Sequence, residues 1–410
     1  MSEDSWIIRN FIILHLCGFI KGIINGFLIW FLPIMTMEYG ITVFTLSFII
    51  ATLLNVIASV AGGFLAEKSG KYTLLVSDLT FLFSILLLYL ALLQHDVAYT
   101  FSIIFIASSV ILNSVADALP TVASLVMRIE SVPKVWRGKI LSLGSLLSPA
   151  SYALGSALLG YMYGHLEKNI FIITSIVMFI TALLRLLLIE TSPMKNHLVS
   201  GSKMSRNLIE GLRILIKNRY LVMLATAFLL GVSGIFSRFL SPFLRDIVGL
   251  SIAEISILYS MFNIVQLVSS IPLGHLIDVY TKRHSISLLL GASMLLNASI
   301  ITMVAILAPL NRSFALLLIL LPALNLLINI GLRVFIVSYF GALRSFAVAG
   351  VHATTSMGAM IMPLIGLIWI LNPVLTLVIS GSVPNILAAS ILMRIASRIE
   401  IDKKENMTSS

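Results

Sequence analysis

The chain has 410 residues, of which 59% are hydrophobic and only 11% are charged, and its formal net charge is +10. A soluble domain carries about 25% charged residues, so this composition excludes an ordinary water-soluble fold and indicates a membrane protein. The lone Cys17 excludes an intramolecular disulfide or a cysteine-based metal cluster, and the basic residues form no nucleic-acid-binding motif, so we expect no nucleic-acid partner.

Twelve apolar runs follow one another along the chain. A bilayer-spanning helix needs roughly 20 mostly apolar residues, so the pattern predicts an all-α membrane protein with 12 transmembrane helices. The polar stretch 1–10 leads into the first run without a small-residue cleavage site, which indicates a retained helix rather than a signal peptide. The predicted spans are 11–34, 43–66, 73–93, 98–128, 139–164, 169–190, 219–244, 252–279, 284–307, 313–340, 347–371 and 374–397.

The placement of Lys and Arg predicts the topology. Of the 27 basic residues, 21 fall on the side of the two termini, in loops, in tails or near the ends of spans. The opposite side has three, and three more lie inside spans. Because cytoplasmic loops carry the excess of positive charge, we expect a multi-pass protein of the cell (inner) membrane with both termini cytoplasmic.

One longer polar connection lies between the sixth and seventh spans, and it contains Pro193, Gly201 and several basic residues. It predicts a cytoplasmic linker at 191–218 between an N-terminal six-helix half, 1–190, and a C-terminal six-helix half with a short cytoplasmic tail, 219–410.

A short motif occurs once in each half. The sequence after the second span reads Gly63-Phe64-Leu65-Ala66-Glu67-Lys68-Ser69-Gly70-Lys71, and the sequence after the eighth reads Gly274-His275-Leu276-Ile277-Asp278-Val279-Tyr280-Thr281-Lys282-Arg283. Both copies follow Gly-x-Leu-x-acid with a basic residue four positions later. Such a repeat at equivalent places indicates a duplicated transporter fold.

This motif resembles the loop 2–3 motif of the major facilitator superfamily, Gly-x-Leu-Ala-Asp-Arg-x-Gly-Arg, and its weaker copy in loop 8–9. Glu67 replaces the usual Asp, and Thr281 replaces the late Gly of the second copy. A further pair, Gly144-x-x-x-Ser148-Pro149 and Gly358-x-x-x-Met362-Pro363, supports the repeat. The first of these also resembles the superfamily's antiporter motif, although a proline kink between packed helices is the favoured interpretation.

The resemblance implies two pseudo-symmetric halves that alternate access to a central site, with a latch on the cytoplasmic side. Glu67 would face the start of the eleventh span near Ala347, and Asp278 the start of the fifth near Gly138, where helix N-termini favour negative charge. For the glycines of the motif, a structural role in tight turns and close helix packing is as plausible as a role in gating. The predicted gating residues are Gly63, Glu67, Gly70, Lys71, Arg128, Arg137, Gly274, Asp278, Lys282 and Arg283.

Polar residues inside the spans predict the binding site. Ionisable residues deep in a span each cost about 2.5–3.5 kcal/mol on insertion scales and mark functional sites by default. The resemblance implies that spans one, four, seven and ten line the cavity. These spans contain four deep ionisable residues and three pairs of polar residues at i,i+4 spacing, which places both members of a pair on one face of the helix. The predicted substrate-binding residues are Lys21, Asn25, Asn113, Asp117, Arg238, Asn329 and Arg333.

Two alternatives for these residues remain. Arg238 could extend outward beside Arg245 and Asp246, and Asp117 could simply neutralise Lys21 or Arg333. Asp78 is assigned to the cytoplasmic gate, and His15 and His352 to core packing.

These features predict a secondary transporter of a small solute that works by alternating access, needs no cofactor or metal, and is a monomer in the lipid bilayer. The chain has no nucleotide-binding motif or catalytic triad, so it is not expected to be an enzyme. Asp117, as the only acid placed deep in a span, predicts proton coupling, and the excess of deep cations predicts an organic anion as solute. The alternatives are a multidrug or metabolite efflux pump with an apolar cavity and a membrane receptor or sensor, although the short tails offer no output domain.

Overall fold

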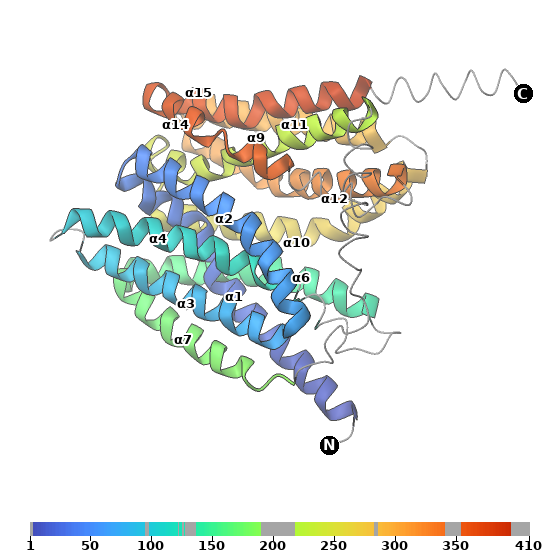
Figure 1. Ribbon diagram of the computed structural model, residues 1–410. Helices are drawn as coiled ribbons and strands as arrows, with labels where there is room; N and C mark the ends of the chain where they lie inside the picture. The colour runs from blue at the N-terminus through green and yellow to red at the C-terminus, as the bar shows by residue number, and fades with distance from the viewer. Residues whose placement is uncertain are drawn as a thin grey trace, which may run out of the picture. The chain divides into compact units, whose positions relative to one another are not determined.

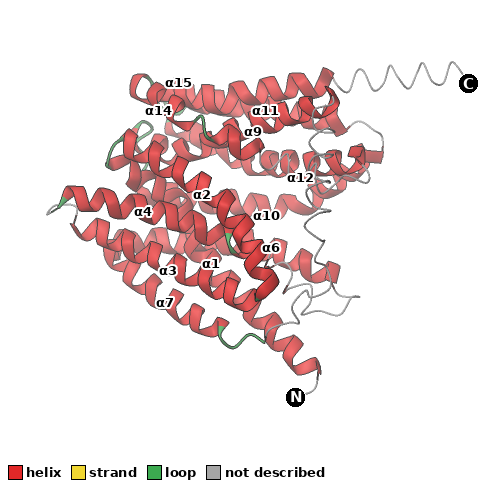
Figure 2. Ribbon diagram, in the orientation of Figure 1, coloured by secondary structure: helices red, strands yellow, loops and turns green. Residues whose placement is uncertain are grey.

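The computed structural model describes residues 3–94, 98–121, 123–124, 127, 137–189, 218–282, 286–340 and 354–394. Within these ranges the side chains of 3–7, 67, 137–145, 218–222, 282, 333 and 336–340 are not described. All regular secondary structure in the described ranges is helical (Figure 2). By contact, the chain divides into unit 1, which comprises Met1–Leu198 and Leu250–Ile264, and unit 2, which comprises Val199–Gly249 and Val265–Ser410.

Unit 1 contains the first six predicted spans. Its helices are α1 (Glu3–Glu38), α2 (Ile41–Lys68), α3 (Gly70–Gln94), α4 (Tyr99–Ala118), α6 (Arg137–Leu166), the 3₁₀ turn η2 (Glu167–Asn169) and α7 (Ile170–Arg185). Figure 1 shows α3 between α4 and α7, and α3 packs against both, while α1 packs against α6. The first part of α10 (Ile252–Lys282) also belongs to unit 1, and Ser260 Oγ donates to the carbonyl of Ala153 on α6 at 2.9 Å.

Glycines allow α1 and α6 to approach at backbone distance. A Cβ on Gly26 would overlap the backbone of Tyr152, and one on Gly155 would overlap the carbonyl of Ile23. Small residues permit such close packing between membrane helices. The contact brings Tyr152 of α6 beside the turn of α1 that contains Asn25.

Unit 2 contains the remaining helices. The labelled ones are α9 (Asn218–Asp246), the rest of α10, α11 (Ile286–Leu307), the 3₁₀ segment η3 (Arg312–Leu320), α12 (Leu321–Phe340), α14 (Met362–Leu371), α15 (Pro373–Leu377) and the π turn η5 (Val378–Ser382), and residues 354–359 and 383–394 are helical as well. Leu290, Met294 and Leu392 are fully buried in its apolar core. At the π turn, Asn385 Nδ2 donates to the carbonyl of Gly381 at 2.7 Å and to Ser233 Oγ at 2.8 Å.

Within the described residues, each of the twelve predicted spans coincides with helix. In the described ranges, eleven stretches are long and apolar enough to cross a membrane, and one of them, Leu146–Arg185, covers most of α6 and all of α7. The all-α membrane fold with twelve spans is therefore confirmed. Two of these spans are interrupted near a proline: α4 ends at Ala118 and helical residues resume at Pro120, and the helical residues that begin at Thr354 are interrupted before α14, which starts at Met362, directly before Pro363. The predicted linker lies outside the described residues except for Asn218.

Candidate functional site

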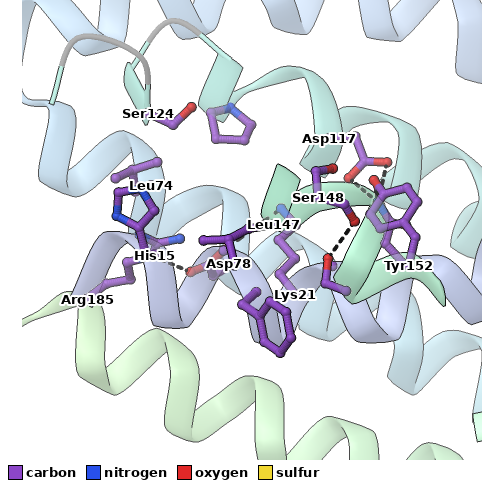
Figure 3. A pocket seen from close by; sticks show the side chains of 16 residues that line it. His15, Lys21, Leu74, Asp78, Asp117, Ser124, Leu147, Ser148, Tyr152 and Arg185 are labelled. Atoms are coloured by element: carbon purple, nitrogen blue, oxygen red, sulfur yellow. Dashed lines mark hydrogen bonds and ion pairs between the residues drawn. The ribbon is translucent and has the colours of Figure 1, made fainter. Parts of the chain in front are cut away.

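A polar cavity of about 230 Å³ lies inside unit 1, between α1, α3, α4, α6 and α7 (Figure 3). Its charged side chains come from four different helices and its hydroxyl groups mainly from α6. Polar groups that converge in a cavity of a membrane helix bundle are typical of a solute site. The polar residues of the lining are His15, Lys21, Asn25, Asp78, Asp117, Ser124, Ser148, Ser151, Tyr152 and Arg185.

Lys21 occupies the centre of the cavity lining. Its Nζ donates to Ser77 Oγ at 2.8 Å and to the carbonyl of Ala116 at 2.9 Å, and it lies 3.8 Å from Asp78 Oδ1. The ammonium group also lies 5.0 Å from the ring centre of Phe81, within the range of a cation–π interaction. Its side chain is only 11% exposed, so these contacts replace water as its solvation.

A proline explains why the Ala116 carbonyl is available. In a helix this oxygen would accept from the backbone N–H four residues later, but residue 120 is proline, which has no N–H. The carbonyl instead accepts from Lys21 Nζ and from Ser77 Oγ, the latter at 2.8 Å. The helix break at the end of α4 therefore creates the acceptor that binds the buried ammonium group.

Asp78 and Arg185 form a second, more deeply buried pair. Arg185 Nε donates to Asp78 Oδ2 at 2.8 Å, and the two side chains are 6% and 2% exposed. Arg185 is the last residue of α7, and Asp78 lies in the third turn of α3. Each oxygen of the carboxylate thus faces a different base, Oδ1 facing Lys21 and Oδ2 facing Arg185.

Asp117 has a different environment. Asn25 Nδ2 donates to both carboxylate oxygens, at 2.9 and 3.0 Å, and also to the Tyr152 hydroxyl at 3.3 Å. Asp117 is exposed, so its carboxylate remains accessible from the cavity. Figure 3 shows Lys21 between Asp78 on one side and Asp117 with Tyr152 on the other.

The structure brings three of the predicted substrate-binding residues together: Lys21, Asn25 and Asp117. Asn113 lies on α4 one turn before Asp117 but is not among the described residues that line this cavity.

Two other predicted residues, Arg238 and Asn329, belong to unit 2, where Arg238 is half-buried and Asn329 is exposed. The side chain of Arg333 is not described. The roles of Asn113, Arg238, Asn329 and Arg333 stay predictions.

One premise of the sequence analysis is corrected. From the sequence we counted more deep cations than deep acids, but Asp78 lies 3.8 Å from Lys21, and the two bases of the cavity lining, Lys21 and Arg185, equal its two acids in number. We assigned Asp78 to the gate and counted Arg185 among the basic residues on the side of the termini, so neither was predicted as a site residue, and Tyr152 was not predicted either. The sequence could have indicated this pair, because Asp78 and Arg185 are charged residues of opposite sign that each lie inside an apolar run of the N-terminal half.

The gating motif is only partly described. Lys71 Nζ donates to the carbonyl of Leu186 at 2.7 Å, just after α7, and Gly70 is buried at the start of α3. Gly63 is half-buried near the end of α2, whereas in the second copy Gly274 has open space around it and Asp278 is exposed. Arg128 and Arg283 lie outside the described residues, as do the side chains of Glu67, Arg137 and Lys282. The latch therefore stays a prediction.

Comparisons with known proteins agree with this architecture. The profile of the Major Facilitator Superfamily matches residues 14–246. No curated protein matches the sequence. Among solved structures, the nucleoside transporter NupG is 15% identical, with 95% of this chain and 99% of that chain covered and a TM-score of 0.73.

Two further solved structures have the same fold. The xylose transporter XylE from E. coli, in an inward-open conformation, is 14% identical with 96% of each chain covered and a TM-score of 0.65. A bacterial homologue of the human lysosomal transporter Spinster is 12% identical, with 97% of this chain and 96% of that chain covered and a TM-score of 0.61. The family profile spans more than half of the sequence, so this chain belongs to the Major Facilitator Superfamily and is a membrane transporter rather than an enzyme.

Proposed function

We propose that this chain is a proton-coupled secondary transporter of a small polar solute, and that the cavity of unit 1 contributes to its binding site. The observation that carries the proposal is the Asp117 carboxylate, which is accessible from the cavity and is oriented by Asn25. An accessible carboxylate can exchange a proton with water. Its protonation would change the hydrogen bond from Asn25, because a neutral carboxyl group is a weaker acceptor than a carboxylate.

The cavity favours a small hydrogen-bonding solute over a large apolar drug. Its volume of about 230 Å³ is below the roughly 300–1,000 Å³ of sites for drug-sized ligands. The amide of Asn25 and the hydroxyl groups of Ser148, Ser151 and Tyr152 offer both donors and acceptors. An apolar-cavity efflux pump is therefore the weaker alternative.

The choice of solutes to test follows from the same groups. Hydroxyl-rich solutes match these donors and acceptors, and two proteins of similar structure are a D-xylose–proton symporter and a nucleoside transporter. An organic anion is the second candidate, favoured by Arg238 and Arg333, which the sequence places in spans of unit 2.

Transport assays in proteoliposomes test the proposal. The probes are radiolabelled D-xylose, uridine and lactate, each measured with and without an inward proton gradient. We expect gradient-driven accumulation of at least one hydroxyl-rich probe, loss of that accumulation in Asp117→Asn, and retention of solute exchange in the same variant. The control is Asp246→Asn, which removes a partly exposed acid outside the cavity. Unchanged accumulation in Asp117→Asn would eliminate its coupling role, and accumulation of lactate alone would favour the anion.

The distribution of basic residues, 21 on the side of the termini, supports a cytoplasmic location for both termini in the inner membrane. Protease treatment of oriented membrane vesicles would test this, because a C-terminal epitope tag should be cleaved only when the cytoplasmic face is accessible. We further propose a monomer, which the mass of the protein in detergent would test.

A further inference from the structure

The two acids of the cavity are placed on opposite sides of one flexible cation. Lys21 Nζ binds the Ala116 carbonyl, and Ala116 directly precedes Asp117 in α4. One helical turn further along α1, about 5.4 Å, Asn25 binds the Asp117 carboxylate. The ammonium group nevertheless points to Asp78, Ser77 and the Ala116 carbonyl.

We propose that Asp78 is a specificity-determining residue that keeps the Lys21 ammonium away from Asp117, so that Asp117 accepts hydrogen bonds from hydroxyl or amine groups of the solute. This inference rests on the proposed transport function and narrows the solute class. Lysine has a compact charge on a flexible four-carbon stem. An ammonium group released from Asp78 would pair with the nearest accessible carboxylate and occupy the place of the solute.

Arg185 acts as a positioning residue for Asp78. Its guanidinium group binds Oδ2 at 2.8 Å and leaves Oδ1 directed at Lys21. Both side chains of this pair are almost fully buried, so water cannot substitute for either partner. The geometry of the planar guanidinium group thus fixes the orientation of the carboxylate, and through it the position of the ammonium group.

A consequence for solute charge follows. The ammonium group of Lys21 has three N–H donors, of which two bind Ser77 Oγ and the Ala116 carbonyl, and the group lies 3.8 Å from Asp78 Oδ1. The Asp117 carboxylate is accessible from the cavity. An anionic solute at that place would meet the negative charge of Asp117. A neutral polyol or an amine would instead donate to it.

The first test needs no solute. A high-resolution structure of Asp78→Asn should show Lys21 Nζ within about 4 Å of the Asp117 carboxylate, the range of an ion pair. If Lys21 keeps its contacts with Ser77 and Ala116, the proposal is wrong. Should Asp78→Asn not fold, Asp78→Asn/Arg185→Gln removes the buried acid together with its base and is expected to show the same movement of Lys21.

The second test measures binding of D-xylose, uridine and ethanolamine. Asp78→Asn should weaken binding of the probe that the parent protein recognises by about tenfold or more, equivalent to 1.4 kcal/mol. Adding Lys21→Met to Asp78→Asn should recover most of that loss, because the competing cation is gone. Asp246→Asn serves as the control and should bind as the parent does.

The outcomes separate the two proposals. A double variant as weak as Asp78→Asn would show that Asp78 acts only through stability and would overturn this inference. A parent protein that binds and transports none of the hydroxyl or amine probes would contradict the proposed function, while the position of Lys21 in the Asp78→Asn structure would still decide the role of Asp78.

Discussion

The buried pair of Asp78 and Arg185 makes the sharpest prediction about stability. Among the described residues, Arg185→Gln leaves a carboxylate that is 2% exposed with Lys21, 3.8 Å away, as its remaining ion-pair partner. Breaking a buried ion pair typically costs about 3–5 kcal/mol, because one charge remains uncompensated. Since Lys21 compensates part of this charge, we expect a loss near the lower end, about 3 kcal/mol.

The chain provides a matched control in Arg245→Gln. Arg245 Nε lies 2.7 Å from Asp246 Oδ1, nearly the same geometry, but its side chain is 23% exposed and that of Asp246 is 35% exposed. Ion pairs with access to solvent contribute about 0–1 kcal/mol. Thermal unfolding of both variants in the same detergent would measure the difference. If the two variants lower the unfolding temperature equally, burial does not determine the strength of the Asp78–Arg185 pair and the reasoning fails.

Three further predictions concern packing and gating. Gly26→Ala should separate α1 from the Tyr152 backbone and lower the free energy of unfolding by about 1–3 kcal/mol. The control is Gly164→Ala: Gly164 has open space around it, so this variant should not lower the unfolding temperature. If both variants lower the unfolding temperature equally, the close contact between α1 and α6 does not contribute to stability. Lys71→Met removes a cation from the carbonyl end of α7 and should cost about 0.3–1 kcal/mol in low salt, a difference that high salt should abolish. Glu67→Gln should increase the labelling, from the cytoplasmic side, of cysteines introduced along the cavity by about two- to fivefold. The measurement uses a background variant that lacks the native cysteine. Unchanged labelling would show that Glu67 does not act as a latch.

The sequence predicts the helices well because the signal is strong and local. A run of about 20 apolar residues has few alternatives to a spanning helix, and every predicted run coincides with one. Lys21, Asn25 and Asp117 could be found because polar residues in the middle of such a run are costly unless they face a partner or a cavity.

The Asp78–Arg185 pair could not be predicted in the same way. The two residues are 107 positions apart, and each lies near the end of its apolar run, where a charged side chain can also reach the membrane surface. Their contact depends on the packing of α3 against α7, which no local pattern contains. The acceptor at Ala116 is an intermediate case, since Pro120 indicates a free carbonyl but not the group that binds it.

We propose that solute movement through this protein is coupled to protons at Asp117. The most direct measurement is the pH change inside proteoliposomes when D-xylose or uridine is added outside, with no proton gradient imposed. We expect solute-dependent proton flux in the parent protein and none in Asp117→Asn, although that variant still exchanges solute. Solute uptake by the parent protein without proton flux, or equal proton flux in Asp117→Asn, would contradict it.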